Sequence, residues 1–180
     1  MLISMLLFGH IGVTLGIFFG LGFFIPRLKT IIDPRYLAIG ALLPDLIDKP
    51  LGMIIFASTF ENGRIISHTL LFVLSLFLMA LYLYEKKKDI KVLSLASGSF
   101  FHLMEDQMWA TPKTLLWPLL GWNFPKSQTD FNGIEYLTKL FEKSFTFHIS
   151  FSSVPEILGM GIIVILALHW LIKEFGQNKF

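Results

Sequence analysis

The sequence predicts an all-α integral membrane protein with about four transmembrane helices, and two observations support this fold class. Of the 180 residues, 54% are hydrophobic and 16% are charged, whereas soluble domains average about 45–50% and about 25%. Four stretches also approach the roughly 20 apolar residues that a helix needs to cross the hydrocarbon core of a bilayer. No soluble fold buries runs of this length, so we expect residues 1–180 to form a single membrane domain.

The first two predicted spans have the clearest boundaries. The first covers about residues 2–25, contains no charged residue and is interrupted only by His10. It lacks the basic start and the small-residue cleavage site of a signal peptide, so we expect it to be retained. The second covers about residues 65–84 and ends in tyrosines followed by the lysines at 86–88, which are typical of a membrane interface.

The other two predicted spans differ in strength. The third covers about residues 92–109, and its last two turns carry ionisable side chains, which makes it the weakest by hydropathy. The fourth covers about residues 154–172 and closes with His169, Trp170 and Lys173, which suit the bilayer interface. The chain is therefore expected to cross the bilayer four times.

Two long loops separate these spans and are predicted to lie on the same side. Residues 34–60 indicate a short helix, a proline-bounded turn and another short helix on or dipping into the membrane. Apolar residues recur at helical spacing over 134–141, which predicts an amphipathic interfacial helix. Alternation over 145–151 favours an extended segment along the interface.

The basic residues predict an orientation in the cytoplasmic (inner) membrane. Four of them lie within residues 86–91, so we expect this short loop, and with it both termini, to be cytoplasmic. The density of basic residues in the short loop decides this orientation, because the two long loops carry similar total numbers of basic residues.

Composition also excludes several kinds of site. The chain has no cysteine, so disulfides, thiol nucleophiles and Fe–S ligation are excluded, and any metal must use His and carboxylate ligands. The formal charge of +2 is small and scattered, which makes nucleic acid an unsuitable partner. Membrane lipid is the expected partner, and the oligomeric state stays open.

Ionisable side chains in or beside the predicted spans are the candidate functional residues, because each costs about 2.5–3.5 kcal/mol on insertion scales. The end of the first span, the start of the second and the end of the third face one side of the bilayer. This topology brings most of the candidates together, and only His10 has to reach from greater depth. The candidate metal ligands are His10, Asp45, Asp48, His68, His102 and Asp106.

His102 and Asp106 lie four residues apart, which places them on one helical face with about 5–6 Å between Cβ atoms. Imidazole and carboxylate suit Zn²⁺ or Mn²⁺, and an open coordination position would activate a water for hydrolysis. Two further residues are catalytic candidates. Glu105 would act as a supporting acid or a general base, and Arg64 would pair with a phosphate group.

Each candidate also has a structural explanation when it is taken alone. His10 could form a hydrogen bond between helices, and the two aspartates after the first span could complete turns or caps. His68 could be an ordinary residue at the start of a helix, and the pair that closes the third span could be a structural couple. Their gathering at one membrane face favours a site, whereas we interpret His148 and His169 as structural.

Ordered motifs run along the first two thirds of the chain. They are Gly9-His10, then Leu42-Leu43-Pro44-Asp45 with Asp48 and Pro50, then Arg64 through His68-Thr69-Leu70, and finally His102 through Asp106 followed by Leu116-Trp117-Pro118. In these blocks the sequence resembles the YdjM-type, LexA-regulated inner-membrane proteins, a family described as membrane-bound metal-dependent hydrolases. The resemblance implies a multi-span membrane hydrolase with a divalent metal, and it carries candidate ligand status to the six residues named above.

The sequence departs from this family at two places. Gly63 stands where the family often has a His, and the spacing of Asp45 and Asp48 is wider than the common pattern, so the sequence leaves open which of the two binds metal. The order of candidate ligands is also similar to that of zinc phospholipase C and P1-type nucleases. Those enzymes add a His-x-x-x-Glu pair that neither His148 nor His169 supplies, so we expect one or two metals here and not three.

Together, these features predict a membrane-bound metal-dependent hydrolase. The expected substrate is a phosphoester of a lipid or another small amphiphile, attacked by a metal-activated water. The alternatives are a non-catalytic membrane protein that transports metal ions or protons, with ligands near the bilayer midplane, and a structural membrane protein in which the polar residues join helices.

Overall fold

The structure is a computed structural model that describes residues 5–126, 135, 138–139, 142 and 154–177. The helices of these residues are α1 (Leu7–Phe24), α2 (Leu28–Ile31), α3 (Pro34–Pro50), the π-helical turn η1 (Leu51–Ile55), α4 (Ala57–Phe60), α5 (Leu70–Lys87), α6 (Lys91–Glu105), the 3-10 turn η2 (Met108–Ala110), α7 (Pro112–Leu115) and α9 (Val154–Gln177). The described residues contain no strand, which confirms the all-α prediction.

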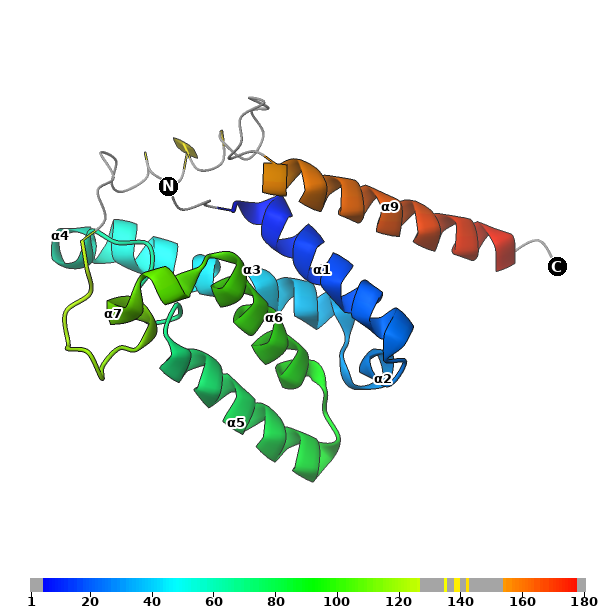
Figure 1. Cartoon of the computed structure of the whole chain (residues 1–180), viewed down its shortest axis with the longest axis horizontal. Coiled ribbons are helices and arrows are strands. Elements are labelled where there is room, and N and C mark those ends of the chain that lie inside the picture. The colour runs from blue at the N-terminus through cyan, green and yellow to red at the C-terminus, as the bar shows by residue number, and fades with distance from the viewer. Residues whose placement is uncertain (1–4, 127–134, 136–137, 140–141, 143–153, 178–180) are drawn as a thin grey trace.

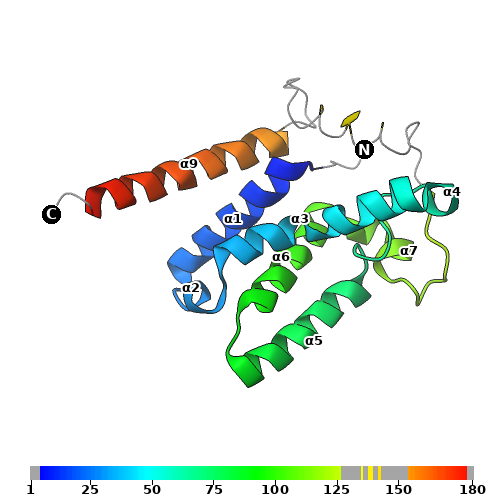
Figure 2. The ribbon, with the colours of Figure 1, turned by 180° about the vertical axis from the view of Figure 1, so that it is seen from behind.

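The long helices pack side by side in the order α9, α1, α3, α6 and α5 (Figure 1, Figure 2). α3 lies between α1 and α6, while α9 packs on the other side of α1. α1 and α5 begin, and α3 and α6 end, at one end of this bundle. The predicted polar residues lie at this end and form a polar cluster, which consists of His10, Asp45, Asp48, His68, His102, Glu105 and Asp106.

Two of the described helices, α1 and α9, are long and apolar enough to cross a membrane. The prediction of four such helices is therefore confirmed only for the first and the last. The helix of the second predicted span starts only at Leu70. The residues before it are held outside the helix because Asp48 accepts hydrogen bonds from the backbone N–H groups of residues 65, 67 and 68. Thr69 then caps α5 by accepting a hydrogen bond from the backbone N–H of Phe72. The third is short, because α6 has 15 residues and spans about 22 Å of a core about 30 Å thick.

The prediction for residues 34–60 is wrong for α3, which is a helix of 17 residues with Pro44 in its interior. The helix begins cleanly because Pro34 occupies its first turn and the side chain of Asp33 accepts a hydrogen bond from the backbone of Arg35 at 2.9 Å. α3 returns along α1 and carries Asp45 to the start of α1. The candidate residues therefore meet beside the start of the first span, and His10 does not have to reach them from greater depth.

α1 and α9 are parallel and pack through glycines. Gly9 donates its backbone N–H to the Glu156 carboxylate at 2.9 Å, and a Cβ placed on Gly12 would lie 2.1 Å from the carbonyl oxygen of Gly159. Small residues at such contacts let helix backbones approach closely in membranes. Because the two helices run in the same direction, their ends at Phe24 and Gln177 both point away from the polar cluster (Figure 1). The prediction that both termini lie on one side is not supported.

A methyl group at Gly12 is expected to separate α1 from α9. The Gly12→Ala variant should lose about 1–3 kcal/mol of stability, because its Cβ would overlap the backbone of Gly159. Thermal unfolding in detergent measures the change. Gly20→Ala is the matched control, since a Cβ at Gly20 meets nothing within 4 Å and alanine favours the helix. Equal stability of the two variants would contradict the proposed contact.

Some predictions fall outside the described residues. These are the extended segment at 145–151, His148 and, apart from the separate positions 135 and 138–139, the amphipathic helix at 134–141. His169 lies exposed on α9.

Candidate metal centre

His68 is positioned by Asp48, which holds the non-helical segment before α5. The Asp48 carboxylate accepts backbone N–H groups from Ile65 at 2.7 Å, Ser67 at 2.9 Å and His68 at 3.1 Å. The same carboxylate accepts the Nδ1–H of His68 at 2.8 Å. Both side chains are fully buried. Because Nδ1 carries the proton, the Nε2 atom of a neutral His68 presents a lone pair to the cluster.

His102 is positioned by the close contact of α6 with α3. A Cβ on Gly98 would lie 2.2 Å from the carbonyl oxygen of Leu37, so only glycine allows this approach. At this distance His102 donates its Nδ1–H to the carbonyl oxygen of Ala41 at 2.7 Å. A carbonyl can only accept, so the Nε2 atom of His102 also presents a lone pair.

Pro44 strengthens the same contact between the two helices. It has no backbone N–H, so the carbonyl of Gly40, four residues earlier, lacks its normal helical partner. The Ser99 hydroxyl on α6 donates to this oxygen at 3.1 Å. The proline therefore creates an acceptor at the helix contact beside His102.

The imidazoles of His68 and His102 face each other with two carboxylates around them. Their Nε2 atoms lie 3.2 Å apart. Asp45 Oδ1 lies 3.6 Å from the Nε2 of His68 and 3.8 Å from that of His102, and Asp106 Oδ2 lies at the same two distances. We call these four atoms, Asp45 Oδ1, His68 Nε2, His102 Nε2 and Asp106 Oδ2, the candidate ligand set.

The candidate ligand set fits a divalent transition-metal ion. Two Nε2 lone pairs at 3.2 Å repel each other unless a proton or a cation lies between them. Donor atoms about 2.0–2.1 Å from a tetrahedral Zn²⁺ lie about 3.3–3.4 Å from one another, and the donor atoms of Asp45, His68 and His102 approach this spacing with separations of 3.2–3.8 Å. Each imidazole also donates its Nδ1–H to an oxygen, as metal-bound histidines usually do.

The charge of the polar cluster points to a cation as well. Its carboxylates belong to Asp45, Asp48, Glu105 and Asp106, and none is more than 7% exposed. Two basic residues touch them: Lys49 bonds to Asp45, and Arg64 Nε lies 2.8 Å from Asp106 Oδ2. With neutral imidazoles two buried negative charges remain, and a divalent ion would balance them.

The pKa of His68 reflects this excess of negative charge. Burial alone lowers the pKa of an imidazole, but contacts with Asp106, Asp45 and Asp48 outweigh burial and raise the pKa of His68 to about 10. In the metal-free protein a proton is therefore held where the carboxylates converge.

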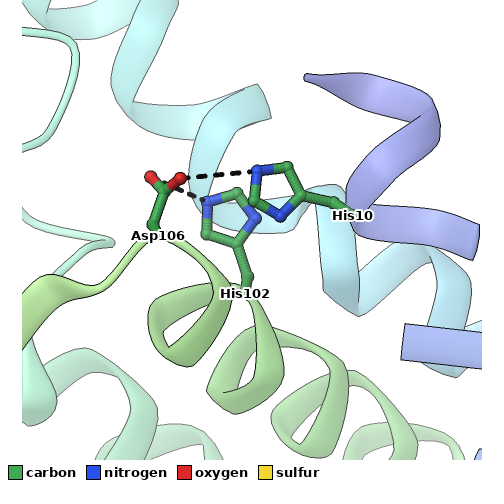
Figure 3. A group of neighbouring side chains, drawn as sticks. All are labelled: His10, His102 and Asp106. Atoms are coloured by element: carbon green, nitrogen blue, oxygen red, sulfur yellow. Dashed lines mark ion pairs between the residues drawn. The ribbon is translucent and has the colours of Figure 1, made fainter. Parts of the chain in front are cut away.

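His10 enters the cluster from the second turn of α1 (Figure 3). Its Nδ1 lies 2.7 Å from Glu105 Oε2, and Thr14 donates to the other oxygen of Glu105 at 2.9 Å. Its ring stacks on the ring of His102 with centroids 4.0 Å apart, and its Nε2 lies 3.5 Å from Asp106 Oδ1. Glu105 thus orients His10, and both of its oxygens are engaged.

Comparison with known proteins agrees with these features. The model of a family described as YdjM inner membrane protein matches residues 5–178. The chain belongs to the YdjM inner membrane protein family. No curated protein and no solved structure matches this YdjM-family chain. The family and the two apolar helices together identify it as a membrane protein.

The structure brings together all six ligand candidates of this YdjM-family protein, but it gives them different positions. Asp45 faces the two Nε2 atoms. Asp48 lies behind His68, and both of its oxygens accept hydrogen bonds from the segment before α5. Of the two aspartates between which the sequence left the choice open, Asp45 is the one whose position could hold an ion together with His68 and His102. Glu105 is placed as an orienting group of His10 and not toward the candidate ligand set.

Sequence reasoning missed three supporting residues of the cluster. Lys49 neutralises Asp45 and shares a helix face with it four residues on, a spacing that could have been noticed. Ser99 lies one helical turn before His102, but its partner became available only through Pro44. Thr14 lies one turn after His10, and nothing in the sequence connects it to Glu105.

Proposed function

We propose that this YdjM-family protein is a membrane-bound hydrolase that uses a divalent metal, Zn²⁺ or Mn²⁺, to cleave a phosphoester of a lipid or another amphiphile. The observation that carries the proposal is the candidate ligand set: two imidazole Nε2 atoms 3.2 Å apart, flanked by carboxylate oxygens within 3.8 Å. His68, His102, Asp45 and Asp106 would hold the ion. When bound, the ion would supply Lewis acidity, which lowers the pKa of a bound water to about 7.

The chain's own residues would bind and orient the substrate. Arg64 is the most exposed charged group in contact with the ligand set, at 28% of its side chain, and it touches Asp106 through Nε. Its remaining guanidinium donors are available for a phosphate group, which they bind in a forked geometry. Lys49, at 14% exposure, adds a second positive charge beside Asp45. These two cations favour an anionic substrate group.

The surroundings of the cluster favour an amphiphilic substrate. Just after α6 the chain exposes Trp109 and Trp122 together with Leu119, at 56%, 76% and 84% of their surfaces. Aromatic and apolar side chains of this kind gather where a bilayer meets water. At the opposite end of the bundle, α5 closes with Lys86 and Lys87. This arrangement supports an inner-membrane protein whose cluster lies near one interface, within reach of lipid headgroups.

The position of the cluster also favours hydrolysis over transport. A transport site is expected near the middle of the bilayer, with access from both sides. His10 is the fourth residue of α1 and Glu105 is the last residue of α6, so the cluster lies at one end of these helices.

Metal analysis with paired variants tests the proposal. Detergent-purified protein should retain a divalent ion and hydrolyse a lipid phosphoester, and chelation should abolish this activity until Zn²⁺ or Mn²⁺ is restored. His102→Ala should remove the Nε2 donor and release the ion from the ligand set, with activity falling to background. Elemental analysis and phosphate release measure the two effects.

The matched control is His169→Ala, which removes an exposed imidazole of α9 and should leave metal content and activity unchanged. A folded wild-type protein that binds neither ion at any loading, or that cleaves the substrate equally well after chelation, would refute the proposed function. Normal metal content in folded His102→Ala would do the same for the assigned ligands.

A further inference from the structure

A second group of buried donor atoms lies beside the candidate ligand set. His10 Nε2 and Asp106 Oδ1 are both buried and both lack a hydrogen-bond partner, although they lie 3.5 Å apart. His10 is fully buried and Asp106 is 3% exposed. A buried polar atom without a partner is destabilising, so a ligand that binds both atoms would remove this penalty.

The His10 imidazole is oriented in the same way as those of His68 and His102, through a hydrogen bond of its Nδ1 atom to an oxygen. A carboxylate accepts but does not donate, so the contact of Nδ1 with Glu105 Oε2 at 2.7 Å places a proton on Nδ1. Nε2 then presents a lone pair to another acceptor, Asp106 Oδ1. Two buried acceptors that face each other repel, and a cation bound between them would turn this repulsion into attraction.

Asp106 faces both groups with different oxygens. Its Oδ2 lies 3.6 Å from the Nε2 of His68 and 3.8 Å from that of His102, while its Oδ1 faces His10. The stacked rings of His10 and His102 both turn a nitrogen toward this carboxylate (Figure 3). A carboxylate with one oxygen toward each of two donor groups has the form of a bridge between two metal ions, which in two-metal sites lie about 3.5–4 Å apart.

We propose that His10 and Asp106 form a second divalent-cation position, with Asp106 bridging it to the candidate ligand set and Glu105 orienting His10. This inference rests on the proposed function for the first ion. His10 Nε2 and Asp106 Oδ1 are the protein donors, and water completes the coordination. A second divalent ion gives the cluster net positive charge, so the paired site favours a substrate group with negative charge, such as a phosphate.

The test counts and characterises Mn²⁺ in the full-length, detergent-purified protein. After chelation and reloading with Mn²⁺, elemental analysis should find about two ions per chain, and the EPR spectrum should show the exchange coupling of a close pair. His10→Ala should bind about one ion with an isolated six-line spectrum, and its unfolding temperature establishes that it is folded. His169→Ala, the exposed control, should keep both ions and the coupled spectrum.

The outcomes separate this inference from the proposed function. One ion per chain with an uncoupled spectrum in the wild type overturns the second position and leaves the first standing, whatever the folding of His10→Ala. No bound Mn²⁺ or Zn²⁺ overturns both. Two coupled ions that persist in folded His10→Ala overturn the assignment of His10 as a ligand.

Discussion

Replacing Asp48 with alanine is expected to destabilise the protein by about 3–5 kcal/mol, the largest effect expected for any side chain of the polar cluster. The carboxylate accepts three backbone N–H groups and the Nδ1–H of His68. All of these donors are buried with it, so the alanine variant leaves them without partners. Thermal unfolding in detergent should show a midpoint about 6–20 °C lower.

Two further variants separate this effect from ordinary loss of a carboxylate. Asp48→Asn keeps one acceptor oxygen and should lie between the wild type and Asp48→Ala in stability. Asp33→Ala removes the cap of α3, a half-buried aspartate that accepts one backbone N–H and two hydrogen bonds from the exposed Arg35 side chain, and should cost only about 1 kcal/mol. If Asp48→Ala is no less stable than Asp33→Ala, Asp48 does not hold the segment before α5.

Adding a methyl group at Gly98 is expected to push α6 away from α3 and to disturb the metal centre at the same time. The new Cβ would lie 2.2 Å from the Leu37 carbonyl oxygen and 2.6 Å from the Ala41 backbone nitrogen. Gly98→Ala should therefore lose about 3 kcal/mol of stability. Because His102 is oriented by the carbonyl of Ala41, metal affinity should fall as well, about 10–100-fold.

Gly161→Ala is the control for this variant, since a Cβ at Gly161 meets nothing within 4 Å. Its stability and its metal affinity should match those of the wild type. Calorimetric titration with Zn²⁺ measures the affinities. A Gly98→Ala protein that binds Zn²⁺ with wild-type affinity would show that the spacing of α3 and α6 does not position His102.

The parts of the fold that sequence reasoning predicted are those that depend on local composition. α1 and α9 follow from uninterrupted apolar runs, because lipid requires such length and composition from a helix on its own. The convergence of histidines and aspartates was also predictable, since ionisable groups beside apolar segments are costly unless they serve a site. The His102 and Asp106 pair follows from helical spacing alone.

The parts that were not predicted depend on contacts between distant segments. Pro44 and the charged residues around it indicate a helix end, yet α3 continues because Ser99 takes up the carbonyl that the proline leaves free. Asp45 and Asp48 are equivalent in composition, and only the backbone of residues 65–68 distinguishes their roles. The start of α5 at Leu70 follows from the same contacts.

Because α1 and α9 pack in the same direction, the number of times that the chain between them runs along the bundle is restricted. α1 leads away from the polar cluster, and α9 starts beside it again at Glu156. The chain between them must therefore traverse the bundle an odd number of times. α3, α5 and α6 supply this odd number, with α3 as a polar return leg that no hydropathy profile would count. A count of four apolar spans without α3 would place the start of α1 and the end of α9 at the same end of the bundle, whereas the structure places them at opposite ends.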